Sequence, residues 1–260
     1  RHDGSGKNAF KNPLSFRYLD DNFIESDAVK IGKTFMDYLK KTKDPRIHVY
    51  CSLKDGNTEF DKQFGLPNGY DSHTIADAPS GSFVGLENTS NFNINTILRL
   101  DAPTIFLMPS ETKLLLAEAV LRNWTNGNAE VLYKEAITSS MKEQEIAYGT
   151  QGKITDEEIE TYLAQNLFST ANNTEKLQII GEQYWVATFI NGYESYANWR
   201  RTGYPKLIPT NYSGSMSPGV IPTRLPYPTD EYSINRANVD TANQQQGADK
   251  VTTHIWWDID

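Results

Sequence analysis

The sequence has no long hydrophobic run. Its richest apolar stretch, residues 114–121, is short and contains Glu118, whereas a membrane-spanning helix needs about 20 predominantly apolar residues. Hydrophobic residues make up 38% of the 260 residues, and the mean hydropathy is −0.57. We therefore expect a water-soluble chain that does not cross a bilayer.

Cysteine is almost absent, which limits the possible metal and redox chemistry. The only cysteine is Cys51, so the chain cannot form an internal disulfide or a cysteine-based zinc cluster. The four histidines, His2, His48, His73 and His254, are far apart, and none belongs to a metal-binding His-Glu-x-x-His motif. We predict no metal ion, no cofactor and no catalytic residue, with Cys51 a small buried side chain.

Positive charge is also scarce. The chain carries 25 lysines and arginines against 33 aspartates and glutamates, which gives a formal net charge of −8. The basic residues form no long cluster that could outweigh this charge locally, and an acidic surface repels the phosphate backbone. Nucleic acid is therefore excluded as an expected partner.

Helical periodicity is the strongest structural signal. Apolar residues recur at every fourth position in residues 26–42, Asp27 can cap the start, and Asp44-Pro45 ends the segment. A second helix is expected from Pro109, with Ser110 as its N-cap, to about residue 124. Asn126-Gly127 then ends this helix, and a partner helix follows over residues 128–141. The short turn predicts an antiparallel pair.

Two further helices are expected after this pair. Thr155 and Glu158 have the spacing of a capping box, in which each residue bonds the backbone of the other, so a shorter helix should follow Thr155. Residues 174–200 read as one long helix, and Gly203 is suited to its C-terminal end.

The rest of the sequence is irregular. Residues 52–103 are rich in Gly, Asn, Ser and Asp, and residues 205–260 contain many of the prolines. Such long stretches without periodicity are usually functional loops. We expect a single region over residues 1–260, divided into a helix and turn (26–51), a loop-rich excursion (52–108), a helical core (109–205) and an irregular C-terminal segment (206–260).

Aromatic residues, 12% of the chain, are the best candidates for ligand contacts. Trp185 and Trp199 lie on an expected helix and should pack in the core. Aromatic residues in Gly/Asn/Ser-rich loops can instead stack on the apolar face of a sugar while amide side chains bind its hydroxyls. The candidates are Tyr70, Phe83, Phe92 and Tyr212. The alternative for each is an aromatic that anchors its loop to the core.

Several motifs occur in a fixed order along the chain. They are Asp44-Pro45-Arg46-Ile47, Leu115-Leu116-Ala117-Glu118-Ala119, Trp199-Arg200-Arg201-Thr202-Gly203-Tyr204-Pro205, and Pro222-Thr223-Arg224-Leu225-Pro226-Tyr227-Pro228 followed by Glu231, Asn235 and Asn238. In this order they resemble the C-terminal half of the SusD-like (SusD/RagB) nutrient-binding outer-membrane lipoproteins. The resemblance covers roughly residues 15–240. Arg224 can pair with a carboxylate, so we expect the last motif to support the fold.

The resemblance implies a mainly α fold of tetratricopeptide-like helix pairs with long irregular loops. It also implies nutrient capture at the extracellular face of the outer membrane, beside a SusC-like TonB-dependent transporter. Residues 1–7 are polar and do not begin with Met. We therefore expect the family's N-terminal half and lipid anchor to lie outside this chain, so that membrane contact comes only through that anchor.

The functional expectation is non-catalytic binding of an oligosaccharide or polysaccharide, with residues 52–95 and 207–220 forming or bordering the ligand surface. One alternative is a helical-repeat adaptor that binds a peptide or a protein. Another is a glycoside hydrolase, because such enzymes use two carboxylates that need no fixed sequence spacing, and acidic residues are numerous here.

Overall fold

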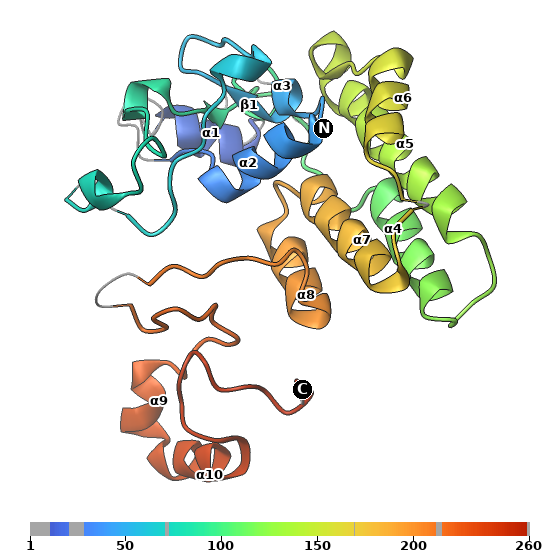
Figure 1. Ribbon diagram of the computed structural model, residues 1–260. Helices are drawn as coiled ribbons and strands as arrows, with labels where there is room; N and C mark the ends of the chain where they lie inside the picture. Colours follow the sequence, from blue (N-terminus) through green and yellow to red (C-terminus); the bar gives the residue numbers. More distant parts are fainter. Residues whose placement is uncertain (1–10, 21–28, 71–72, 169, 212–214, 259–260) are drawn as a thin grey trace. The chain divides into compact units, whose positions relative to one another are not determined.

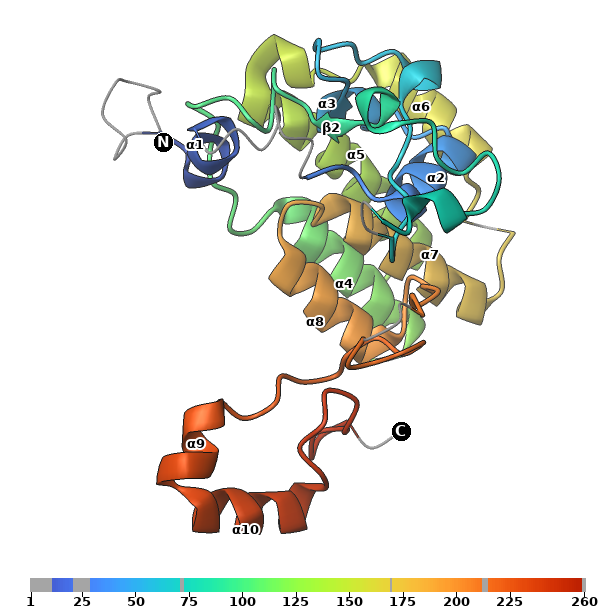
Figure 2. The same cartoon turned by 90° about the vertical axis from the view of Figure 1, so that its left-hand side faces the viewer.

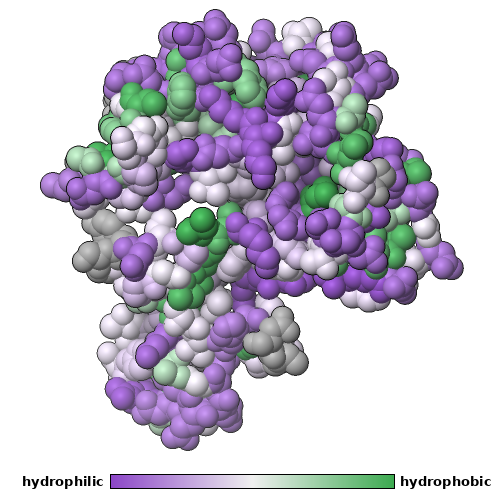
Figure 3. Space-filling view, in the orientation of Figure 1, coloured by the Kyte–Doolittle hydropathy of each residue, from purple (hydrophilic) through white to green (hydrophobic). Residues whose placement is uncertain are grey.

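The computed structural model describes residues 11–20, 29–70, 73–168, 170–211 and 215–258 (Figure 1). Ten α-helices and a single two-stranded sheet occur in these residues, which confirms the mainly α fold. The chain forms two compact units, Arg1–Asn68 with Ser72–Lys206, and Gly69–Asp71 with Leu207–Asp260. None of the described helices is both long enough and apolar enough to span a membrane. The face of the molecule in Figure 3 is largely hydrophilic, with smaller hydrophobic areas.

The first unit holds eight of the described helices, seen from two directions in Figures 1 and 2. They are α1 (Pro13–Asp20), α2 (Lys33–Thr42), α3 (Ile47–Tyr50), α4 (Pro109–Leu121), α5 (Ala129–Tyr148), α6 (Asp156–Gln165), α7 (Asn173–Ala187) and α8 (Gly192–Thr202). The sheet pairs β1 (Cys51–Ser52) antiparallel with β2 (Asn91–Phe92). Cys51 is fully buried, as expected.

Helices α4 and α5 form the expected pair, with α7 packed against α4. Asn128 caps α5, because its Oδ1 accepts hydrogen bonds from the backbone amides of residues 130 and 131 at 3.0 and 3.1 Å. The N-cap of α4, however, is Met108 and not Ser110. The reason is that the Ser110 amide and hydroxyl both donate to the Glu143 carboxylate, at 3.0 and 2.7 Å.

The expected long helix over residues 174–200 is wrong, because the structure has two helices there, α7 and α8. The Thr188 hydroxyl bonds back to the Tyr184 carbonyl at 2.8 Å. Asn191 then caps the new helix by accepting from the Glu194 amide at 3.3 Å. The predicted end is confirmed: Gly203 ends α8 with φ at 68°, a conformation that favours glycine. The capping box of Thr155 and Glu158 at α6 is also confirmed.

Helix α2 begins at Lys33 rather than in the expected region near residue 26. The residues just before it are held by backbone pairing with distant segments. Ile31 donates to the Ser90 carbonyl at 2.8 Å and accepts from the Leu66 amide at 2.7 Å. Because these bonds require an extended chain, the helical spacing of Ile31 does not produce a helix there. The expected cap, Asp27, lies outside the described residues.

A buried arginine ties the early helices to the later ones. Arg46 lies in the turn between α2 and α3, and its side chain is fully buried. Its Nε donates to Asp44 Oδ1 at 2.9 Å, its Nη1 to Ser140 Oγ on α5 at 3.0 Å, and its Nη2 to Gln183 Oε1 on α7 at 2.7 Å. One side chain therefore joins three parts of the first unit.

The second unit is more regular than the sequence suggests. The segment expected to be irregular, 206–260, contains α9 (Thr229–Ile234) and α10 (Arg236–Gln246). Helix α9 starts directly after Pro228, with Asp230 and Glu231 in its first turn, where carboxylates favour helix formation. The motif that precedes it is held by Asp249, which accepts hydrogen bonds from Arg224 at 2.8 Å and from the Tyr232 hydroxyl at 2.6 Å.

The ion pair that joins α4 to α8 gives a testable pH dependence. Glu118 is buried, and both of its oxygens accept hydrogen bonds from Arg201 at 2.7 Å, while Arg122 adds a third bond. Burial would raise the pKa of Glu118, but the bonds from Arg201 and Arg122 outweigh it and lower the pKa. A lowered folded-state pKa stabilises the fold above the ordinary value near 4.3, and this stabilisation is lost as the pH falls.

We expect Glu118→Gln to lower the free energy of unfolding by about 1 kcal/mol at pH 7, because both arginines are partly exposed to solvent. The difference from the unchanged protein should shrink below about pH 4. Urea unfolding of the two proteins at pH 7 and at pH 3 measures the difference in their free energy of unfolding at each pH. A difference that is equally large at the two pH values would contradict the assigned role of the carboxylate.

Candidate functional site

The four aromatic candidates lie in different surroundings. Phe83 is half-buried in the first unit, and Tyr70 is half-buried in the second. Phe92 lies in β2 and packs against the hydrophobic core, with its ring edge-to-face against Tyr18 at 5.3 Å and Phe189 at 5.5 Å between ring centroids. Tyr212 lies outside the described residues. The structure thus places Phe92 where a loop anchor would be, and leaves Tyr70 and Phe83 as stacking candidates.

The two predicted ligand loops come together at one point. Gly69 lies so close to Thr210 that a β-carbon added at Gly69 would be 2.6 Å from the Thr210 side chain. Thr210 also accepts a hydrogen bond from the Gly219 amide at 3.1 Å. Tyr70 therefore stands beside the 207–220 loop, within the second unit.

The excursion over residues 52–95 is held together by buried polar side chains. Ser90 Oγ donates to Gln63 Oε1 at 2.8 Å, and Gln63 Nε2 donates to the Asn57 carbonyl at 3.0 Å. Asn93 Nδ2 donates to the His48 carbonyl at 2.7 Å, and the Thr96 hydroxyl bonds the Val49 carbonyl. Many of the amides and hydroxyls that suggest a sugar-binding surface are thus used to stabilise the loop itself.

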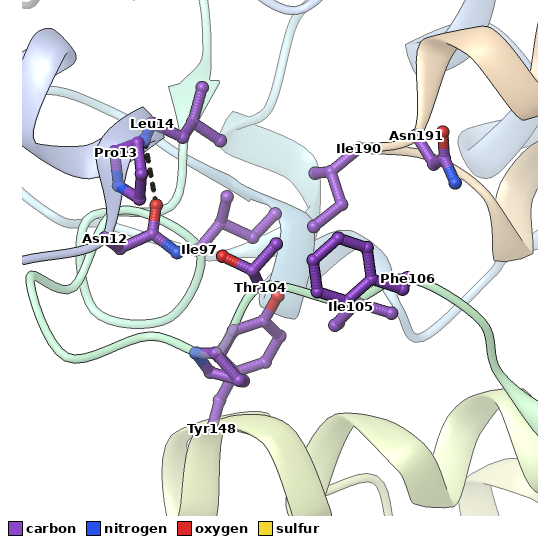
Figure 4. A pocket seen from close by; sticks show the side chains of 11 residues that line it. Asn12, Pro13, Leu14, Ile97, Thr104, Ile105, Phe106, Tyr148, Ile190 and Asn191 are labelled. Carbon is purple, nitrogen blue, oxygen red and sulfur yellow. Dashed lines mark hydrogen bonds between the residues drawn. The ribbon is translucent and has the colours of Figure 1, made fainter. Parts of the chain in front are cut away.

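A cavity of about 380 Å³ opens on the first unit (Figure 4). It is bounded by the start of α1, the segment 97–106, the end of α5 and the turn between α7 and α8. Most of its lining is apolar, from Pro13, Leu14, Ile97, Pro103, Ile105, Phe106 and Ile190. The polar lining residues are Asn12, Thr104, Tyr148 and Asn191.

Helix-terminal hydrogen bonds position the polar residues of this cavity. Asn12 Oδ1 accepts from the Leu14 amide at 2.9 Å, and Asn12 Nδ2 donates to the Ala102 carbonyl at 2.9 Å, so the backbone fixes the orientation of this side chain. Asn191 caps α8 through its Oδ1. Tyr148 is the last residue of α5, and its carbonyl accepts from Arg99 at 3.1 Å. Two helix starts and a helix end therefore meet at the cavity.

The electrostatics of the cavity are those of a neutral site. None of the lining residues in the described part of the chain is Asp, Glu, Lys, Arg or His. Burial raises the pKa of Tyr148 to about 12, so its hydroxyl stays protonated at neutral pH and can donate a hydrogen bond. Elsewhere, the described residues contain no group of three or more His, Cys, Asp or Glu side chains that could hold a metal ion. That no metal or cofactor binds remains a prediction.

Comparison with known proteins identifies the family. Residues 4–228 match the model of a SusD-like family described as "Starch-binding associating with outer membrane". The chain belongs to this SusD-like family. The recognition drawn from the ordered motifs is therefore confirmed. At the level of the family, the match indicates carbohydrate binding at the outer membrane.

Solved structures support the same assignment for this SusD-like chain. A chitin-binding protein is 29% identical, with a TM-score of 0.77 over 97% of this chain and 54% of that one. A SusD homologue from Bacteroides fragilis is 27% identical, with a TM-score of 0.71 over 88% of this chain and 52% of that one. A chitin-binding SusD homologue from Flavobacterium johnsoniae shares the fold at 24% identity, with a TM-score of 0.72 over 98% of this chain and 53% of that one.

The SusD-like chain thus spans about half the length of these solved structures. A search of curated proteins found no match. The activity, ligand and partners of the whole protein are accordingly matters for proposal.

Sequence reasoning missed the cavity in this SusD-like chain. Its walls come from four separate segments, and their meeting depends on tertiary packing. Two local signals do point to it: Asn12-Pro13 and Asn191-Gly192 both have the pattern of a helix start.

Proposed function

We propose that this chain binds oligosaccharide at the outer face of the outer membrane and passes it to a SusC-like TonB-dependent transporter, without breaking a bond. The observation that carries the proposal is the family match over residues 4–228. The chitin-binding relatives support a glycan rather than a peptide as the ligand, because both are named for binding a polysaccharide.

The loops supply suitable contacts for a glycan. Phe83 lies between Gly81 and Gly85, whose positive φ angles of 76° and 91° make tight bends on either side of it. Tyr70 follows Gly69, another glycine with positive φ, beside the 207–220 loop. In this proposal each ring packs on the C–H face of a sugar, and neighbouring polar groups bind hydroxyls.

Affinity electrophoresis through gels that contain amylopectin, xyloglucan or glycol chitin tests glycan binding. We expect retardation by at least one of these neutral polysaccharides. Phe83→Ala and Tyr70→Ala should each weaken binding by about 2- to 13-fold, since an aromatic contact contributes about 0.5–1.5 kcal/mol. Trp124→Ala is the matched control, because Trp124 is an exposed aromatic that follows α4 in the sequence and belongs to neither loop.

Different outcomes would contradict different parts of the proposal. Failure of every polysaccharide to retard the protein would remove glycan binding, and competition by peptides would favour an adaptor. Retardation that Phe83→Ala and Tyr70→Ala leave unchanged would remove these two residues from the site. For delivery, we expect the transporter to co-purify with the protein from detergent-solubilised outer membranes, and its absence would contradict this step.

A further inference from the structure

We propose that the cavity between α1, the end of α5 and the α7–α8 turn binds the acetamido-bearing unit of a neutral N-acetylated sugar, with the Tyr148 hydroxyl donating to the acetamido carbonyl. The inference deepens the proposed function and rests on it. It adds a subsite made of residues other than Tyr70 and Phe83 and names the class of sugar that this subsite takes.

The first argument is charge. Recognition of a uronic acid or a sulfated sugar calls for arginine or lysine, which pair with carboxylate and sulfate oxygens. An amino sugar with a free ammonium group would call for a carboxylate. Among the described residues, the lining of this cavity includes neither kind of residue, which favours an uncharged ligand.

The second argument is an unused hydrogen-bond donor. Tyr148 is only 3% exposed, yet within the described part of the chain its hydroxyl has no hydrogen-bond partner. Figure 4 shows its side chain rising from α5 into the cavity. The hydroxyl is not among the fully enclosed polar atoms that lack a partner, so it is open to the cavity and can donate to a ligand there. Burial raises the pKa of this phenol to about 12, so the hydroxyl stays protonated and can donate to an acceptor such as a carbonyl oxygen.

The third argument is the apolar wall. A plain hexose presents hydroxyls on most sides and needs many polar partners, but the Asn12 oxygen and one of the two Asn12 N–H donors already bond the backbone. An acetamido group combines a methyl group with one carbonyl acceptor and one N–H donor. Its methyl group fits the surface of Leu14, Ile105 and Ile190. The Phe106 ring, 84% exposed, stands at the cavity and offers a face to the sugar ring.

The fourth argument is size. About 380 Å³ lies near the lower end of the ~300–1,000 Å³ typical of small-molecule sites. The cavity therefore suits a terminal unit or a short segment, while the remainder of an oligosaccharide would extend outside it.

The test compares two disaccharides that share a β-1,4 linkage and differ in the acetamido group. The protein of residues 1–260 is titrated with N,N′-diacetylchitobiose and with cellobiose, and binding is followed by ligand-observed NMR. We expect diacetylchitobiose to bind at least 5-fold more tightly than cellobiose.

Tyr148→Phe removes only the hydroxyl. It should weaken diacetylchitobiose binding by about 2- to 13-fold, the equivalent of one hydrogen bond of about 0.5–1.5 kcal/mol, and leave the urea unfolding midpoint unchanged. Phe106→Ala should weaken binding similarly. The matched controls are Tyr133→Phe, a buried tyrosine on the same helix that lines a different cavity, and Trp124→Ala, an exposed aromatic. Neither control should change the affinity.

The outcomes separate this inference from the proposed function. Equal affinity for the two disaccharides would overturn the choice of sugar class. Unchanged affinity in both Tyr148→Phe and Phe106→Ala, in a protein that still binds glycans, would overturn the cavity assignment and leave the proposed function standing. Failure to bind any neutral glycan would overturn both.

Discussion

We expect Arg46→Met to lower the free energy of unfolding by about 3–5 kcal/mol, because removing one partner of a buried ion pair leaves the other charge without compensation. Arg46 and Asp44 both have fully buried side chains. Methionine has a similar length and fills the space, so the loss measures the polar contacts rather than a cavity. Urea unfolding followed by circular dichroism at pH 7 gives the value.

The size of this effect follows from the number of elements that one guanidinium joins. Burial would lower the pKa of Arg46, but the Asp44 carboxylate outweighs this and raises the pKa, so the group remains charged. Loss of the side chain would leave Asp44, Ser140 and Gln183 facing one another without their shared donor. Buried polar groups without partners are among the most destabilising defects in a folded protein.

An exposed ion pair provides the control for this prediction. Lys33 and Asp37 are one turn apart on α2 and partly exposed to solvent. Lys33→Met should change stability by about 0.5 kcal/mol or less. The double variant Arg46→Met with Asp44→Leu should recover part of the loss, because it removes both charges together. If Arg46→Met is no more destabilising than Lys33→Met, the buried network does not stabilise the fold as described.

Local signals in the sequence were sufficient to predict several helix termini. Asn128, the Thr155–Glu158 capping box and Gly203 all act through backbone groups within a few residues of themselves, so their effect could be read without the tertiary structure. The break at Asn191-Gly192 was missed because the apolar spacing on either side of it continues as if the helix were unbroken.

Features that depend on distant segments could not be read in the same way. The start of α2 is set by bonds from Ile31 to residues 66 and 90. The packing of Phe92 is set by its contacts with Tyr18 and Phe189. An aromatic in a Gly/Asn-rich loop has the same sequence context whether it anchors the loop or faces a ligand, and only the packing distinguishes these cases.

Gly65 lies where the backbone of the loop-rich excursion pairs with the residues around the start of α2. Leu66 donates to the Ile31 carbonyl and accepts from the Lys33 amide, both at 2.7 Å, and Ser90 donates to the Phe64 carbonyl at 2.8 Å. A β-carbon at Gly65 would lie 2.4 Å from Lys33 Cα and 2.7 Å from Lys33 N. Because these are backbone atoms at the start of α2, they cannot move aside as a flexible side chain can.

We therefore expect Gly65→Ala to lower the free energy of unfolding by about 1–3 kcal/mol, the usual range for overpacking. Backbone amide hydrogen exchange should accelerate at Ile31 and Leu66, since the two chains must separate to admit the methyl group. Gly192→Ala is the control: a β-carbon there meets no atom within 4 Å, and alanine favours the helix that this residue begins. If Gly65→Ala leaves both the free energy of unfolding and the amide protection unchanged, the close backbone contact at Gly65 does not hold the excursion in place. If Gly65→Ala does lower the stability, the close contact between Gly65 and the Lys33 backbone supports the 52–95 loop. Glycan binding through Phe83 in this loop should then weaken as well.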